Sequence, residues 1–133
     1  MQKQRIVAIT KHTVEHCIPE EVSQWIQKNV VIVVDDLSDW ELSPAKNNTE
    51  GIDLLGIFGF EVAYNLPVIG LNHKTIKSRI EAINTTKHEI AHAWLWHLCL
   101  PNGERVTNKL VKEWLIPDIM DDDEEEEDED FKP

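Results

Sequence analysis

The feature that most constrains this chain is a pair of histidines four residues apart, His88 and His92, with Glu89 directly after the first. They lie in an apolar-rich stretch with helical periodicity. On a helix, residues four apart lie one turn apart on the same face, so both imidazoles can reach one metal ion. Glu89 lies about 100° further round, where its carboxylate can take a proton from a metal-bound water. The H-E-x-x-H pattern therefore predicts two metal ligands and a general base on one helix.

The helical wheel indicates how buried this site is. With His88 at 0°, the large apolar residues of the helix fall between about 200° and 340°, whereas His92 and Glu89 fall at about 40° and 100°. A helix that buries its apolar stripe therefore brings both histidines to the edge of the core. The alternative is that two histidines on a helix are merely packed or solvated, because a five-residue pattern also occurs by chance. The apolar context favours metal binding.

A third ligand must come from elsewhere in the chain. His97 is close in sequence but lies near 180° on the same wheel, opposite His88, which excludes it unless the helix breaks. The segment over residues 104–116 also has helical spacing, and it places Glu104 and Asn108 on or beside its inward face. A carboxylate there needs a charged partner, and Zn²⁺ held by the two histidines would be one. The alternative is that Glu104 only caps its helix, since acids are favoured in a first turn.

The predicted site is thus His88, His92 and Glu104 as ligands of Zn²⁺, with Glu89 as the general base. Asn108, one turn after Glu104, is expected to accept a hydrogen bond from the free N–H of a ligand histidine and so to fix the orientation of that ring. Two imidazoles and one carboxylate leave a fourth position open for water, which distinguishes a catalytic zinc from a structural one.

The rest of the chain predicts an α+β domain. Residues 18–28 have the spacing of a helix, and the β-branched run over residues 30–34 is typical of a strand buried on both faces, at the centre of a sheet. Apolar runs at residues 54–64 and 68–71 flank a turn and predict a hairpin-like pair of strands. The glycines in these runs, Gly56, Gly59 and Gly70, indicate bends or places where another backbone or a substrate approaches closely. The motif helix follows, from about residue 76 or 80 to residue 98, and residues 1–17 could form a short helix or a frayed arm.

The net charge of −12 belongs mainly to one end of the chain. Residues 121–133 contain ten acids and one lysine and carry −9, so residues 1–120 carry −3. We therefore expect a domain over residues 1–120 and a disordered acidic tail over residues 121–133, which solubilises the protein, binds a basic partner or shields the site. The absence of a basic cluster argues against direct nucleic-acid binding.

The cysteine content and the terminal sequence bear on the compartment. Cys17 and Cys99 are too few for a disulfide scaffold and form no C-x-x-C motif. No signal peptide and no membrane span is expected from the apolar pattern. These features predict a reducing, cytoplasmic setting.

Several of these residues resemble a known family. The H-E-x-x-H helix, a second helix that begins E-x-x-x-N at Glu104, and its ending Trp114-Leu115-Ile116-Pro117 are similar to the ImmA/IrrE-type zincins, small gluzincin-like metallopeptidases of bacteria and phages. The resemblance covers about residues 54–117. It departs from the family in the short gap between His92 and Glu104 and at Val106-Thr107, where the family usually has Glu-Ala. The run over residues 54–59 also looks like a second small bacterial zincin family, of possible Zn peptidases with acidic sequences.

The resemblance implies a small zincin-like domain, with a short mixed or antiparallel sheet packed on the motif helix and a following ligand helix. It implies zinc-dependent hydrolysis of peptide bonds, an extended substrate paired with an edge strand at Val68–Leu71, and a protein or peptide substrate that is often one dedicated partner such as a repressor. The alternatives are a zincin-derived regulatory or binding protein that cuts nothing, and a metal-free helical interaction module. Tyr64 and His73 are candidates to stabilise the oxyanion, although a structural role suits each better.

Overall fold

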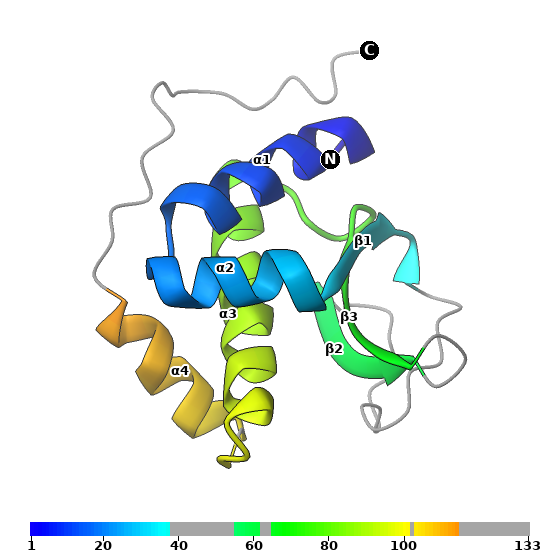
Figure 1. The fold of residues 1–133 in the computed structure, drawn as a ribbon. Helices are drawn as coiled ribbons and strands as arrows, with labels where there is room; N and C mark the ends of the chain where they lie inside the picture. The colour runs from blue at the N-terminus through cyan, green and yellow to red at the C-terminus, as the bar shows by residue number, and fades with distance from the viewer. Residues whose placement is uncertain (38–54, 62–64, 102, 115–133) are drawn as a thin grey trace.

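The computed structural model describes residues 1–37, 55–61, 65–101 and 103–114, and the acidic tail lies outside them. These residues form four helices and a three-stranded mixed sheet (Figure 1), which is the α+β class that the sequence predicts. The elements in chain order are α1 (Lys3–His16), α2 (Glu20–Asn29), β1 (Val31–Asp35), β2 (Gly56–Glu61), β3 (Leu66–Asn72), α3 (Arg79–His97) and α4 (Glu104–Glu113). Helices α1 and α3 pack against the strands, and α4 packs on α3. None of the described helices is long and apolar enough to span a bilayer.

The sheet has the order β1-β3-β2, so β3 lies in the middle. It pairs in parallel with β1, where Val31 faces Val68, and antiparallel with β2, where Gly56 faces Leu71. The hairpin-like pair predicted over residues 54–71 is therefore confirmed for the described residues. It also explains why β3 is buried from Val68 to Asn72, since a strand lies on each side of it and helices cover it.

Two expectations about the sheet are wrong. The β-branched run forms β1, but β1 is an outer strand among the described residues, and its Val31 is 43 % exposed. The segment Val68–Leu71, expected to be an edge strand, belongs to the central β3. Composition reports that a segment suits a pleated, partly buried surface, but it does not report how many strands pair with it. Among the described strands, the outer one that packs against α3 is β2.

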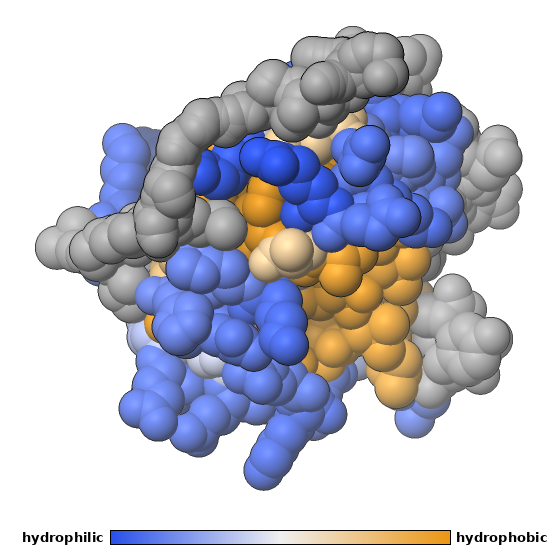
Figure 2. Space-filling model, turned by 90° about the horizontal axis from the view of Figure 1, so that it is seen from above, coloured by the Kyte–Doolittle hydropathy of each residue, from blue (hydrophilic) through white to orange (hydrophobic). Residues whose placement is uncertain are grey.

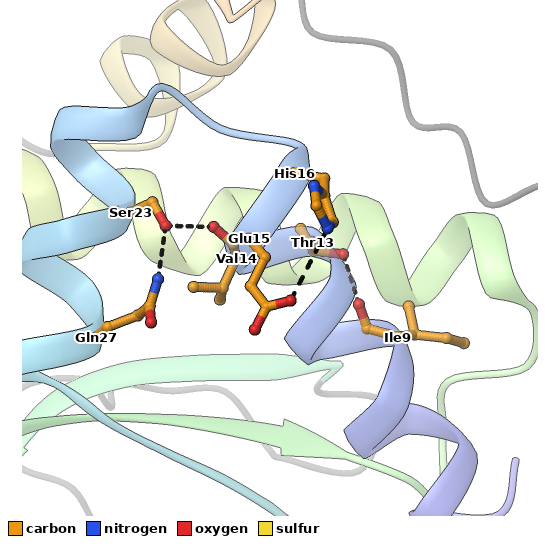
Figure 3. A network of polar contacts seen from close by, with 7 residues as sticks. All are labelled: Ile9, Thr13, Val14, Glu15, His16, Ser23 and Gln27. Atoms are coloured by element: carbon orange, nitrogen blue, oxygen red, sulfur yellow. Dashed lines mark hydrogen bonds and ion pairs between the residues drawn. The ribbon is translucent and has the colours of Figure 1, made fainter.

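The N-terminal residues form a full helix rather than a frayed arm. Ile6 and Ile9 of α1 are buried in the core, which also contains Ile83 and Ile90 of α3. A polar network joins α1 to α2 (Figure 3): Ser23 donates a hydrogen bond to the carbonyl oxygen of Val14 at 2.6 Å and accepts one from Gln27 at 2.9 Å. These contacts satisfy the buried hydroxyl of Ser23 and attach α1 firmly to the domain.

The face of the molecule that carries α1 is not uniformly polar. Figure 2 shows hydrophobic surface exposed there beside hydrophilic side chains. A groove of about 320 Å³ lies between α1, α2 and β1 and contains none of the residues of the predicted metal site. Its lining consists of Val7, Thr10, Lys11, Val14, Glu15, Gln27, Ile32 and Val34.

Both ends of α3 are fixed by local hydrogen bonds. At its start, Ser78 accepts a hydrogen bond from the backbone N–H of Glu81 at 3.1 Å, which satisfies one of the free donors of the first turn. At its end, the N–H of Leu100 donates to the carbonyl oxygen of Leu95 and the N–H of Cys99 donates to that of Trp96. This is the pattern of a Schellman motif, and it requires Cys99 to adopt a left-handed conformation with φ of +61°. The reversal directs the chain back along α3, so that α4 packs beside it.

The left-handed backbone at Cys99 gives a testable prediction. A side chain with a Cβ atom is strained in this region, whereas glycine is not. We expect Cys99→Gly to raise the free energy of unfolding by up to about 1 kcal/mol, measured by urea unfolding at neutral pH. Cys99→Ala is the control, because it removes the thiol and keeps the Cβ atom. Equal stabilisation by both variants would show that the thiol, and not the backbone, is responsible.

Candidate metal centre

Three side chains predicted as metal ligands converge between α3 and α4. His88 Nε2 lies 3.0 Å from Glu104 Oε1, and His92 Nε2 lies 3.1 Å from Glu104 Oε2. One potential ligand atom from each residue can be chosen so that all three lie within 4.8 Å of one another. The two imidazoles are held nearly perpendicular, with ring centroids 4.7 Å apart. The structure thus brings together the two residues of the motif and the acid that begins the next helix.

The spacing of these atoms can be compared with the size of a metal ion. Zinc binds nitrogen and oxygen at about 2.0–2.1 Å with tetrahedral geometry, which puts neighbouring ligand atoms about 3.3 Å apart. The two nitrogen–oxygen distances, 3.0 and 3.1 Å, differ from that value by a few tenths of an ångström. Two imidazoles and one carboxylate are also a ligand set that zinc uses in open sites. The donor set of these residues therefore suits a zinc ion, although the two distances end on different oxygens of Glu104.

Glu104 reaches the histidines from the first turn of α4, but it is not buried. Its side chain is 71 % exposed, so it lies beside the inward face of α4 rather than within it, and the argument from the cost of burying an unpaired charge does not apply to it. The N-cap of α4 is Gly103, and no side chain caps this helix end. The two oxygens of Glu104 instead face the two histidines. The carboxylate of Glu104 therefore meets the two histidines because of where the first turn of α4 lies, and not because a buried charge requires a partner.

Two further side chains of α4 contact the histidines. Asn108 forms a side-chain hydrogen bond with His88, which is the kind of contact predicted for it. Thr107 Oγ1 lies 3.2 Å from His92 Nδ1, and Thr107 is fully buried. The sequence analysis gave Thr107 no role in the site. Its spacing of three residues from Glu104 is the signal that could have identified it, since residues three apart share a helix face.

The predicted base, Glu89, is in a different environment from Glu104. It is only 7 % exposed, and loss of solvent, assisted by the negative charge of Glu104, raises the pKa of Glu89 to about 8. Burial also lowers the pKa of His88, and this effect is larger than the opposing effect of Glu104. A neutral imidazole is the form that binds a metal ion. The lowered pKa therefore favours the neutral form of His88, which is the form that a metal ion would bind.

An open trough of about 430 Å³ gives access to these groups. It lies between the start of β2 and α3, and its lining consists of Leu55, Gly56, Glu81, Asn84, Thr85, His88, Glu89 and Glu104. At Gly56, β2 lies close to α3: a Cβ atom added there would lie 2.8 Å from Thr85 Cγ2 and 3.1 Å from Glu89 Cγ. The nearest groups at this glycine are thus side chains of α3, rather than the backbone or substrate that the sequence suggests, and they leave little room for a larger residue beside the predicted base.

The remaining candidates lie away from the trough or outside the described residues. The ring of His97 stacks on Trp25 with centroids 4.3 Å apart, so His97 does not join the site, as its position on the helical wheel predicts. His73 is not among the residues that line the trough. Tyr64 lies outside the described residues. None of these residues gains support as a participant in the site.

Comparisons with protein-family models and with curated proteins identify no relative of this chain. A scan against protein-family models finds no match, and a search of curated proteins finds no significant similarity. The case for this site therefore rests on its own residues and geometry.

Burial of Glu89 predicts how the stability of the metal-free protein depends on pH. The pKa of Glu89 is about 8 in the folded state, against 4.5 for an unperturbed glutamate, so between these pH values the folded protein holds a proton that the unfolded chain has released. The free energy of unfolding should therefore fall as pH rises through this range, by up to a few kcal/mol. Glu89→Gln removes the titrating group, and we expect the variant to lose this slope and to exceed the wild type in stability above pH 8.

Urea unfolding in the presence of a chelator, repeated over a series of pH values, measures this effect. The exposed Glu113 provides a control, because Glu113→Gln removes an acid and should leave the slope unchanged. An equal slope in the wild type and in Glu89→Gln would contradict the burial of a neutral Glu89.

Proposed function

We propose that this protein is a zinc metallopeptidase in which His88, His92 and Glu104 hold the ion and Glu89 is the general base. The observation that carries the proposal is the convergence of three ligand side chains from two helices beside a buried carboxyl group. The resemblance to the ImmA/IrrE-type zincins supports the same assignment. When bound, zinc would polarise the scissile carbonyl group and acidify a water molecule.

Glu89 is suited to accept and return a proton. It lines the trough beside His88, and burial, assisted by the negative charge of Glu104, raises its pKa to about 8. A cation held nearby favours its ionised form, so the group would have a pKa closer to neutrality when the site is loaded. A base with such a pKa takes a proton from water and passes it to the leaving amine with least difficulty near neutral pH.

The substrate of this reaction is an extended segment of a protein or peptide. The trough opens beside the start of β2, whose only partner among the described residues is β3. An extended chain next to β2 would form backbone hydrogen bonds along that strand, which provides affinity with little sequence selectivity. The strand expected to serve in this way was Val68–Leu71, and β2 takes its place because β3 is paired on both sides. One dedicated partner, such as a repressor, is the substrate that the resemblance suggests.

A second candidate is a binding or regulatory protein in which the same cluster only fastens α4 to α3. It is favoured by the direct contacts of 3.0 and 3.1 Å between Glu104 and the two histidines, because these already satisfy the side chains of the cluster. In that case a metal ion stabilises the fold, and the protein hydrolyses no peptide bond. The two candidates share their ligands and differ in the role of Glu89.

Metal analysis tests the ligand set. We expect the purified protein to bind about one zinc ion per chain, and His88→Ala, His92→Ala and Glu104→Ala each to weaken zinc binding by about 100-fold or more, measured by competition with a chromophoric chelator. His97→Ala is the matched control, since it removes a histidine from the same helix and should leave zinc binding unchanged. Wild-type affinity in the His88 variant would exclude this site, and wild-type affinity in the Glu104 variant would remove Glu104 from the ligand set.

Glu89→Gln separates the two candidates. This variant keeps the shape of the side chain and cannot act as a base, so we expect it to retain zinc and to lose hydrolysis by about 100-fold or more. The wild type and the variant, both loaded with zinc, would be incubated with a peptide library derived from a whole proteome, and new peptide ends would be counted by mass spectrometry. Equal cleavage by both proteins contradicts a role for Glu89, and cleavage by neither protein favours the binding candidate.

A further inference from the structure

We propose that Thr107 is a positioning residue that fixes the ring of His92, so that its Nε2 atom points at the metal position. This inference rests on the proposed metal site, and it concerns a contact that the H-E-x-x-H pattern does not predict. The contact joins Thr107 Oγ1 to His92 Nδ1 at 3.2 Å.

The two nitrogens of His92 have different neighbours. Nδ1 faces Thr107 at 3.2 Å, and Nε2 faces the Oε2 atom of Glu104 at 3.1 Å. Turning the ring over would replace both nitrogens with carbon atoms and would break both contacts. The pair of contacts therefore selects one orientation of the ring.

The same contact suits the tautomer that metal binding requires. A metal ion binds the ring nitrogen that carries a free electron pair, so coordination by Nε2 requires the hydrogen of the neutral ring to be on Nδ1. That N–H then donates to the hydroxyl oxygen of Thr107, which can accept it because a hydroxyl group has two acceptor lone pairs. Thr107 is fully buried, so water does not easily replace its hydroxyl as the partner.

The position of Thr107 on α4 connects this contact to the rest of the site. Glu104, Thr107 and Asn108 are at positions i, i+3 and i+4, which lie on one face of a helix. Glu104 faces both imidazoles, Thr107 contacts His92, and Asn108 contacts His88. One face of α4 thus contributes a ligand and orients both of the others. A rigidly held ligand loses less freedom on binding, which raises the affinity for the ion.

The test compares Thr107→Val with Thr107→Ser in the full-length protein. Valine removes the hydroxyl and nearly keeps the shape, whereas serine keeps the hydroxyl. We expect Thr107→Val to weaken zinc binding by about 10- to 100-fold and Thr107→Ser to restore most of it, measured by chelator competition. Thr86→Val is the control, because Thr86 is also fully buried but donates its hydrogen bond to the carbonyl oxygen of Ala82, and it should bind zinc like the wild type.

A second measurement does not depend on zinc. The nitrogen chemical shifts of the His92 ring, recorded by NMR on the zinc-free protein, report which nitrogen carries the hydrogen. In the zinc-free protein the carboxylate of Glu104 can only accept, so we expect the hydrogen of the neutral ring on Nε2 and the hydroxyl of Thr107 donating to Nδ1, in the wild type and in Thr107→Ser. In Thr107→Val we expect the Nδ1 shift to move to the value of a nitrogen that accepts no hydrogen bond. A role in packing alone would lower the stability of the variant without moving these shifts.

The outcomes separate this inference from the proposed function. If the wild type binds no zinc, the proposed metal site fails, and the ring shifts still test the contact. If the wild type binds zinc but Thr107→Val binds it within about twofold of the wild type, or if the Nδ1 shift of His92 is the same in zinc-free Thr107→Val and in the zinc-free wild type, the positioning role is wrong.

Discussion

The candidate site depends on one contact, in which the carboxylate that begins α4 meets two imidazoles presented by α3. His88 and His92 share a face of α3 because they are four residues apart, but this spacing says nothing about what faces them. The tight reversal at Cys99 brings Glu104 back beside them within a few residues of the helix end. The backbone strain at this position is thus located where the chain must turn sharply. Without this turn the histidines would face solvent alone, and Thr107 and Asn108 would have no ring to contact.

The two acids of the site have separate environments, and this difference suits separate roles. Glu104 is exposed at the rim, so its carboxylate can adjust its position at little cost. Glu89 is buried against the start of β2, where Gly56 leaves just enough room for it. Burial of a carboxyl group without a cation favours its neutral form and shifts its pKa upward. A metal ion at the proposed position would relieve that cost, so metal binding and the ionisation of Glu89 would favour each other.

The sequence predicts well what depends on local pattern and poorly what depends on neighbours. Helical periodicity identified the segments that form α2, α3 and α4, and angular position excluded His97 and selected Glu104. The same reasoning could not tell that the run of valines in β1 lies at the outside of the sheet, or that Val68 lies at its centre, because strand order is decided by long-range pairing. Thr107 was missed for a related reason. A threonine on the inward face of a helix is normally interpreted as a core residue, and only the structure shows that Thr107 contacts the ring of His92.

Helix α4 is the part of the site with the weakest attachment. Thr107 is its one buried residue, followed by Trp114 just beyond its end, whereas α3 is buried along most of its length. Elements with few buried apolar contacts open locally at low free-energy cost. Opening of α4 would carry away one ligand and the side chains that orient the other two, while His88 and His92 stayed on α3. On the proposed metal site, ion binding must therefore stabilise the docking of α4, and a partner that loosens α4 must weaken ion binding by the same free energy, since the two equilibria are linked.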